Sequence, residues 1–153
     1  MKLRLANEKE IIVIYNMCEL IKNNYPFWDE EYPIYDNFLE SYNDDGLYVL
    51  QVERDIVGSI CLEKGITNKY SLSLSRFMIH PNYRRKGYGK IIFELIEHEV
   101  IKKGYNNIEF FVHKDHPFAF DMYKGFGYTD KGLYKTEWDE DFPTYHLFTN
   151  ELK

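Results

Sequence analysis

The stretch that decides how this chain is interpreted is Ile79-His80-Pro81-Asn82-Tyr83-Arg84-Arg85-Lys86-Gly87-Tyr88-Gly89-Lys90. It is a cationic loop with two glycines, and it leads directly into an amphipathic helix. Glycine lets the backbone approach a ligand because no Cβ atom stands in the way. The first turn of the helix adds unpaired N–H groups and the positive end of the helix dipole. The segment therefore predicts an anion-binding site.

The charge of this stretch is opposite to that of the whole protein. The chain has a formal net charge of -6, yet residues 84–90 hold four basic side chains and no carboxylate. An acidic protein is not expected to bind nucleic acid or an anionic membrane surface, which require a broad basic face. We expect the loop to bind a smaller anion.

Length and composition favour one folded domain over residues 1–153. Aromatic residues make up 18% of the chain, which argues against disorder. Cys18 and Cys61 do not have the spacing of a metal or redox motif, so buried reduced thiols are expected. Residues 1–5 lack an apolar leader, and no apolar run approaches the roughly 18 residues of a membrane span. These features favour a cytoplasmic protein.

The hydrophobic pattern predicts the order of helices and strands. The expected elements are a strand at residues 2–5, a helix from residue 7, a short helix at 35–42, and strands at 47–53, 56–62 and 70–79. They continue with a helix after the glycine loop that stops at Gly104, a strand at 108–112, a helix at 117–124, and strands at 127–136 and 144–152. The two-residue link between 47–53 and 56–62 favours an antiparallel hairpin. The order of strand, helix and strand from residue 70 to 112 favours a right-handed crossover and a parallel pair.

The strand at 70–79 changes its pattern partway along. Leu72 and Leu74 alternate with serines, which predicts a half-exposed start, whereas residues 77–79 are continuously apolar and predict cover on both faces. A change of phase near Ser75 and Arg76 would suit a β-bulge.

Spacing excludes two common phosphate-binding loops. A P-loop requires Ser or Thr after Lys90, where Ile91 stands, and a dinucleotide fingerprint requires a third glycine at the position of Ile92. Instead, Arg84-x-x-Gly87-x-Gly89 after the strand end Ile79-His80-Pro81 resembles motif A of the GNAT superfamily of N-acetyltransferases. In that superfamily the backbone N–H groups of the motif hold the pyrophosphate of coenzyme A.

A second stretch, HPFAFDMYKGFGY at residues 116–128, resembles the superfamily signature N-x-x-A-x-x-x-Y-x-K-x-G-F. Ala119, Tyr123, Gly127 and the aromatic Tyr128 match in spacing. His116 replaces the usual Asn, and Gly125 replaces the usual Lys. Together the two motifs cover about residues 77–128.

The resemblance implies both a fold and an activity. The fold is α/β of the α+β type: a central, mixed, mostly antiparallel sheet of about six to seven strands with a splayed parallel pair, flanked by about four helices. The activity is transfer of an acetyl group from acetyl-CoA to a primary amine, with no metal. The pair His113 and His116 lacks the third ligand that a metal site needs.

The resemblance also assigns site residues. The cofactor-binding set is Met78, Ile79, Arg84, Arg85, Lys86, Gly87, Tyr88, Gly89, Lys90, His116, Ala119 and Tyr123. Tyr123 stands where many members use a tyrosine as general acid toward the coenzyme A thiolate. A phenol with a pKa near 10 is reasonably matched to a thiol of pKa about 8.5. His116 is expected either to cap the helix or to contact coenzyme A.

The sequence does not identify the general base that would take the proton of the acceptor amine. Many relatives carry Glu or Asp on the strand before motif A, but this chain has Ser75 and Arg76 in that region. A chain of water molecules, Glu109 on the next strand, or an acid of the C-terminal segment could take the proton of the acceptor.

The acceptor pocket of the superfamily is shaped by the loop between the first two helices and by the last two strands. Both segments are acidic and aromatic here, and the candidate acceptor residues are Trp28, Asp29, Glu30, Trp138 and Asp139. Carboxylates and ring faces attract cations, which predicts a small cationic or polyamine-like amine. A non-catalytic acyl-CoA sensor and a protein N-terminal or lysine acetyltransferase stay open, as does a homodimer.

Overall fold

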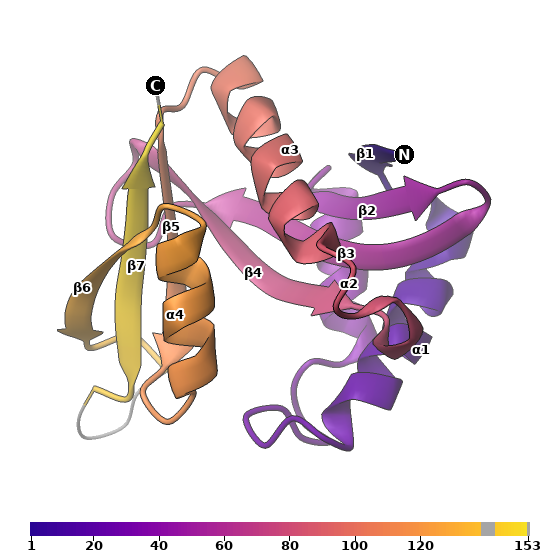
Figure 1. Ribbon diagram of the computed structural model, residues 1–153, viewed down its shortest axis with the longest axis horizontal. Helices are drawn as coiled ribbons and strands as arrows, with labels where there is room; N and C mark the ends of the chain where they lie inside the picture. The colour runs from indigo at the N-terminus through magenta and orange to yellow at the C-terminus, as the bar shows by residue number, and fades with distance from the viewer. Residues whose placement is uncertain (139–142, 153) are drawn as a thin grey trace. The chain divides into compact units, whose positions relative to one another are not determined.

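The structure is a computed structural model that describes residues 1–138 and 143–152. Within them it has seven strands and four α-helices (Figure 1). In chain order these are β1 (Lys2–Leu5), α1 (Ile11–Lys22), α2 (Tyr35–Asn43), β2 (Leu47–Val52), β3 (Asp55–Lys64), β4 (Ser71–Ile79), α3 (Tyr88–Lys102), β5 (Asn107–His113), α4 (Pro117–Gly125), β6 (Thr129–Tyr134) and β7 (Tyr145–Glu151). Single 3-10 turns at Glu8–Glu10 and Pro81–Tyr83 precede α1 and α3.

The strands form one mixed sheet in the order β1-β2-β3-β4-β5-β7-β6. The expected hairpin is present: β2 and β3 pair antiparallel, with Leu47 opposite Cys61. The expected parallel pair is β4 and β5, joined by Ser71–Asn107, Leu72–Ile108 and Ser73–Glu109. The other pairings, β1 with β2 and β7 with both β5 and β6, are antiparallel. Both the fold class and the strand order along the chain predicted from the sequence are confirmed.

The chain divides into two compact units, which we describe separately. Unit 1 comprises Met1–Glu63 and Leu74–Ile96, and unit 2 comprises Lys64–Ser73 and Glu97–Lys153. Both β4 and α3 run from one unit into the other, so residues 71–73 of β4 belong to unit 2 and residues 74–79 to unit 1.

The core of unit 1 is formed by α1, α2 and the strands beneath them. On α1, Ile11, Ile14, Cys18 and Ile21 recur at helical spacing and are buried, because together they form one apolar face. That face joins Phe38 of α2 and residues from β2, β3 and β4 in a single apolar cluster. Because α1 and α2 both pack against the strands, the loop that connects these two helices is held beside the sheet.

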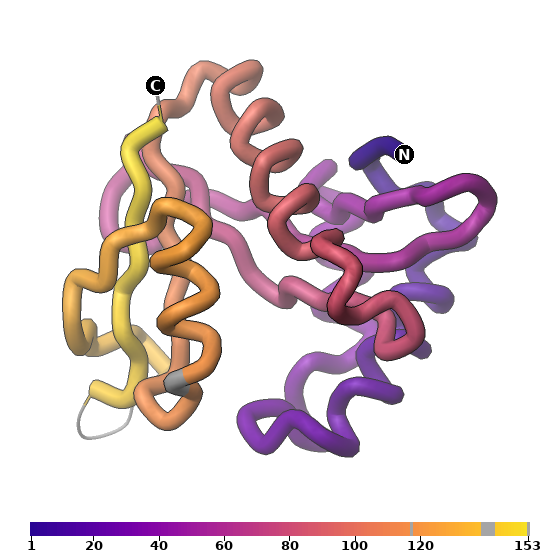
Figure 2. Tube along the Cα trace, viewed as in Figure 1, coloured from indigo at the N-terminus to yellow at the C-terminus, as the bar shows by residue number. Residues whose placement is uncertain are grey.

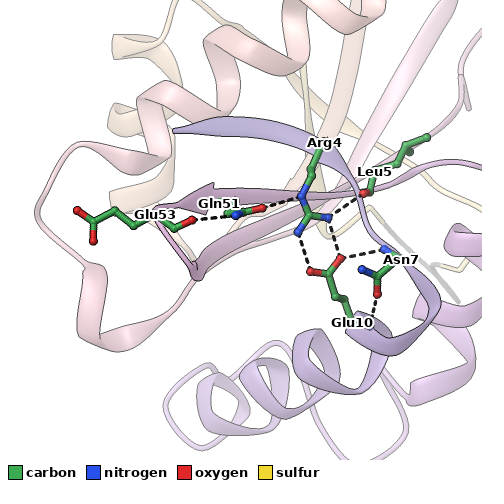
Figure 3. A network of polar contacts seen from close by, with 6 residues as sticks. All are labelled: Arg4, Leu5, Asn7, Glu10, Gln51 and Glu53. Atoms are coloured by element: carbon green, nitrogen blue, oxygen red, sulfur yellow. Dashed lines mark hydrogen bonds and ion pairs between the residues drawn. The ribbon is translucent and has the colours of Figure 1, made fainter.

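An ion pair ties the start of α1 to the edge of the sheet (Figure 3). Arg4 on β1 donates from both Nη atoms to the Glu10 carboxylate, at 2.8 and 2.7 Å, and from Nε to Gln51 of β2 at 2.8 Å. Asn7 and Glu10 form the expected capping box, since each side chain accepts a hydrogen bond from the other residue's backbone N–H. The helix start predicted from these two residues is confirmed.

The backbone of β4 is irregular where the sequence changes phase. Arg76 has φ of 47°, in the left-handed region that residues with a Cβ atom rarely adopt. The half-exposed environment expected before this point is wrong, because Ser71 and Ser73 are as buried as Leu72 and Leu74. In the sheet, β4 lies between β3 and β5, so neither of its edges is a free edge of the sheet.

The core of unit 2 is aromatic. Phe110 of β5 stacks on Phe148 of β7 with ring centroids 5.7 Å apart, and α4 lays Tyr123 edge-on against Phe110 at 4.6 Å. Tyr128, just after α4, is buried and donates a hydrogen bond from its hydroxyl to Glu97 of α3 at 3.0 Å. Ring packing of this kind fixes the rotation of α4 about its axis, and therefore the direction in which Tyr123 leaves the helix.

Candidate acetyl-coenzyme A and acceptor sites

The glycine-containing loop of unit 1 connects β4 to α3, and Figure 2 follows its course. His80 caps the 3-10 turn, since its Nδ1 accepts a hydrogen bond from the backbone N–H of Asn82 at 3.1 Å. Residues 84–87 then lie exposed, and α3 begins at Tyr88. The side chains of Arg84, Arg85 and Lys86 are therefore exposed on the loop directly before a long helix.

Two residues of this loop have left-handed backbone conformations. Arg85 has φ of 62° and Gly87 has φ of 80°. Alternation of left- and right-handed residues turns successive N–H groups toward one side and makes a concave anion-binding backbone. Apart from Gly87 and its two chain neighbours, no heavy atom of the described residues lies within 4 Å of the position that a Cβ atom on Gly87 would take. The open space and the N–H groups at the start of α3 fit a phosphate group.

Tyr83 anchors this loop to the hairpin of β2 and β3. Its hydroxyl donates to Asp55 at 2.9 Å, and this hydrogen bond raises the pKa of the phenol. The ring contacts those of His80 and Tyr88, with centroid distances of 5.7 and 6.4 Å, and Lys86 Nζ lies 5.7 Å from its centroid. Sequence reasoning missed this anchor, although an aromatic residue directly before the basic run was a visible signal.

The end of β4 is held against β3. Met78 is buried, and the backbone N–H of His80, two residues on, donates to Val57 of β3 at 2.8 Å. Gly58 of β3 allows this close packing, because a Cβ atom there would lie 2.8 Å from the carbonyl oxygen of Met78. The strand end at Met78 and Ile79, predicted to pair with the cofactor's pantetheine arm, thus packs closely against β3 within unit 1.

In unit 2, α4 carries the residues of the second motif. Ala119 is buried, and Tyr123 is half-buried between the rings of Phe110, Phe126 and Phe148. His116 occupies the N-cap position, but its side chain makes no capping hydrogen bond, so the capping role expected from the sequence is wrong. Burial, with the charge of nearby His113, lowers the pKa of His116 and favours its neutral form.

The first acidic and aromatic segment lies in unit 1, between α1 and α2. Trp28 packs against the apolar cluster and lies edge-on to Tyr25 at 4.9 Å. Asp29 accepts hydrogen bonds from the backbone N–H groups of Glu31 and Tyr32, at 2.8 and 3.1 Å, and so shapes its own loop. Glu30 is exposed at the tip. We call residues 28–32 the acceptor loop.

The second acidic and aromatic segment lies in unit 2. Trp138 is exposed, and its ring is edge-on to those of Phe111 and Tyr145 at 5.6 and 5.8 Å. Asp139, the other candidate of this segment, lies outside the described residues.

Of the residues considered as general base, Glu109 has a structural role. Its side chain is fully buried, and its carboxylate accepts hydrogen bonds from the backbone N–H groups of Ile66 and Thr67. A carboxylate that is enclosed and already bonded to backbone donors is poorly placed to receive the proton of an incoming amine.

A polar cluster centred on Arg76 was missed at the sequence level. The guanidinium donates to Tyr32 of the acceptor loop at 3.0 Å, to Ser41 of α2 at 2.8 Å and to Glu63 of β3 at 2.5 Å. The change of phase in β4 was a signal for an irregular strand there, but not for these partners. All four residues belong to unit 1.

Two further features bear on the kind of site. Within residues 1–138 and 143–152, no three His, Cys, Asp or Glu side chains are grouped so that they could hold a metal ion. Every helix in this part of the chain is too short or too polar to cross a membrane.

Comparisons with known proteins agree with the fold and the two motifs. The model of the Acetyltransferase (GNAT) family matches residues 14–128. An acetyltransferase of Yersinia pestis (strain Pestoides F) is 24% identical over 120 residues, which cover 78% of this chain and 79% of that protein.

Solved structures share the fold over nearly the whole chain. The structure of yncA from Salmonella typhimurium, solved with its cofactor acetyl-CoA, has a TM-score of 0.78 at 14% identity and covers 100% of this chain and 94% of that one. A spermidine N-acetyltransferase chimera from Vibrio cholerae and hSSAT has a TM-score of 0.73 at 17% identity, covering 99% and 96%. These likenesses show the fold, while the family match spans three quarters of the chain and both motifs. The chain therefore belongs to the GNAT family of acetyltransferases and uses acetyl-CoA.

Proposed function

We propose that this enzyme transfers the acetyl group of acetyl-CoA to the primary amine of a small cationic, polyamine-like acceptor, with Tyr123 as general acid. The observation that carries the donor half is the loop at residues 84–90, where exposed cationic side chains and two left-handed residues precede α3. Arg84, Arg85, Lys86 and the backbone at Gly87 to Lys90 would bind the pyrophosphate. Met78 and Ile79 would pair with the pantetheine arm.

The acceptor half of the proposal rests on charge. Glu30 and Glu31 are exposed on the acceptor loop beside the half-buried ring of Trp28. An ammonium group gains from both carboxylates and ring faces. One of the structural neighbours is named for spermidine, which is a polycation of this class. Asp29 supports the loop, and Trp138 and Asp139 remain candidates for contacts with the acceptor.

The proposed chemistry is direct attack of the free amine on the thioester carbonyl. The tetrahedral intermediate then expels the thiolate of coenzyme A as Tyr123 donates its phenolic proton to that sulfur. The proton that the nitrogen loses on forming the amide returns the Tyr123 phenolate to the phenol form. The aromatic packing of Tyr123 supports this role, because the rings of Phe110 and Phe148 hold its ring in one orientation.

The test measures thiol release from acetyl-CoA with polyamines, monoamines, amino acids and peptide N-termini as acceptors. We expect the highest kcat/KM for polycationic amines, and a preference for anionic or neutral acceptors would refute the acceptor assignment. Tyr123→Phe should lower kcat roughly 100-fold, in the range of general acid catalysis. The matched control is Tyr70→Phe, because Tyr70 is an exposed tyrosine of the loop before β4. Binding of acetyl-CoA without turnover of any acceptor would favour a sensor.

A further inference from the structure

Acetyl transfer to an amine requires a proton acceptor. An alkylamine is mostly protonated at pH 7, and an ammonium nitrogen has no lone pair with which to attack a carbonyl. Strand β4 contains no Asp or Glu between Ser71 and Ile79. The carboxylate of Glu109 already accepts hydrogen bonds from the backbone N–H groups of residues 66 and 67. Neither β4 nor Glu109 therefore offers an available carboxylate for this proton.

One carboxylate of unit 1 reaches β4 from the neighbouring strand. Glu63 lies near the end of β3, and its Oε1 accepts hydrogen bonds from the hydroxyl of Ser75 at 2.8 Å and from Nη2 of Arg76 at 2.5 Å. The side chain of Glu63 is 37% exposed, whereas that of Arg76 is only 9% exposed. One side of this carboxylate is therefore held by the protein, and the side chain still reaches solvent.

The backbone of β4 explains how two consecutive residues reach the same oxygen atom. Successive side chains of a regular strand point to opposite faces of the sheet. Arg76 has φ of 47°, and this irregularity brings its side chain to the same side as that of Ser75. Without it, Glu63 could bond to only one of the two.

This arrangement is costly, which suggests a role beyond folding. A left-handed conformation is unfavourable at a residue with a Cβ atom. The Arg76 guanidinium is taken out of water, and its Nε is buried with no hydrogen-bond partner among the residues that the structure describes. Strained backbone and unsatisfied buried polar atoms cluster at functional sites, where the surrounding structure maintains them.

The cluster is also linked to the acceptor loop. The same Arg76 guanidinium that holds Glu63 donates through Nη1 to the hydroxyl of Tyr32, the last residue of that loop, at 3.0 Å. A single rigid group thus spans from the loop proposed to receive the amine to the carboxylate on β3. Both contacts lie within unit 1.

We propose that Glu63 and Ser75 form the proton-accepting pair of this enzyme, and this inference rests on the proposed function. The N–H bond of the bound ammonium breaks as its proton passes to Ser75 Oγ. The hydroxyl proton of Ser75 passes to Oε1 of Glu63 in the same step. The amine nitrogen keeps the electron pair and attacks the thioester, and Glu63 later releases the proton to water. Arg76 is the positioning residue that orients the carboxylate.

The test compares Glu63→Gln with the unmodified enzyme in the pH dependence of kcat/KM. The amide of this variant keeps an oxygen that can accept from Ser75 and Arg76, but it cannot take up a proton. We expect kcat/KM for spermidine to fall about 100-fold at pH 7. The deficit should shrink as the pH rises, because more of the amine is then already unprotonated. An equal deficit at every pH would overturn the proposal.

A second acceptor separates proton transfer from a structural effect. A fluorinated analogue of the best amine, mostly deprotonated at pH 7, should lose less than about fivefold in Glu63→Gln, because it needs no proton acceptor. Equal losses for both amines would argue for a positional role only. Ser75→Ala should lower kcat/KM for spermidine about tenfold, and an unchanged value would exclude Ser75 from the pair. Glu63→Asp should retain the pH profile of the unmodified enzyme.

The matched control is Glu10→Gln, which also removes a carboxylate paired with an arginine of unit 1 (Figure 3). It should leave kcat/KM unchanged at all pH values. The dissociation constant of acetyl-CoA should be the same in Glu63→Gln and the unmodified enzyme. If the unmodified enzyme turns over no amine, the proposed function fails. If it does and Glu63→Gln matches it, only the present inference fails.

Discussion

The backbone N–H of Thr67 donates a hydrogen bond of 3.0 Å to the carboxylate of Glu109, whose side chain has 0% exposure. The N–H of Ile66 donates to the same oxygen. Because the two residues precede β4 and Glu109 lies on β5, this carboxylate fixes the connection from β3 into β4 within unit 2.

We predict that Glu109→Ala lowers the free energy of unfolding by about 3 kcal/mol, because two backbone donors then lose their acceptor. Glu109→Gln keeps an oxygen and should cost about 1 kcal/mol. Urea unfolding followed by circular dichroism measures both, with the exposed Asp121→Ala as control. If Glu109→Gln instead removed activity from a stably folded enzyme, the structural role assigned to Glu109 would be wrong.

Replacing Gly87 or Gly58 by alanine should affect different properties. We expect Gly87→Ala to weaken binding of acetyl-CoA and Gly58→Ala to lower stability. In Gly87→Ala the new methyl group meets no atom of the described residues within 4 Å, its two chain neighbours apart. The alanine must nevertheless adopt φ of 80°, which costs about 1–2 kcal/mol. Relaxation of the loop should weaken acetyl-CoA binding roughly tenfold or more, as measured by calorimetry.

In Gly58→Ala the methyl group would lie 2.8 Å from the Met78 carbonyl oxygen and 2.8 Å from Ile92 Cδ1. The strands must separate, and we expect a loss of about 3 kcal/mol in unfolding free energy. If Gly87→Ala lowered the unfolding free energy as much as Gly58→Ala, the open space found around Gly87 would be contradicted.

The pair of Arg4 and Glu10 predicts a pH-dependent contribution to stability. The hydrogen bond from Arg4 lowers the pKa of Glu10 below its unfolded value near 4.3. The contribution is therefore complete above about pH 4.3 and is lost as the pH falls through the lower folded-state pKa. Glu10→Gln, which preserves the capping box, should cost about 1 kcal/mol at pH 7 and nothing near pH 2. A gap that persists at pH 2 would point to helix capping instead.

Both cysteines should be inert in the native protein. Burial raises the pKa of Cys18 to about 11 and also raises that of Cys61. At pH 8 only about one Cys18 in a thousand is then a thiolate, the reactive form. A thiol reagent should modify both residues in urea, and in buffer only at the rate of global unfolding. Rapid modification of the native protein would contradict the burial of α1 against the sheet.

Local patterns predicted most of the fold and the glycine loop before α3. The capping box of Asn7 and Glu10, the hairpin between β2 and β3, and the glycine loop before α3 depend on residues close together in the sequence. Their side-chain chemistry specifies the conformation directly. The order of strand, helix and strand then fixes the parallel pair through the handedness of crossovers.

The polar cluster around Arg76 of β4 could not be predicted from the sequence, because it depends on contacts between distant parts of the chain. Contact between Glu63 and Ser75 depends on how β3 and β4 align across the connection at residues 65–70, which is not a tight turn of known register. That connection is set by Glu109, more than 40 residues away. The acidic residues of the acceptor loop also could not be ranked from composition, because only the structure shows that Asp29 bonds to its own loop.

The interleaving of the two units has a consequence for synthesis on the ribosome. Residues 64–73 leave the exit tunnel before α3, but the rest of unit 2 is synthesised later. Glu109, which accepts the hydrogen bond of the Ile66 N–H, follows Ile66 by 43 residues. At about 5–20 residues per second this interval is roughly 2–9 s. During it, the nascent chain exposes the unit 2 end of β4 as an unpaired edge. Protection of residues 64–73 by a chaperone at this stage would matter more than protection of either terminus.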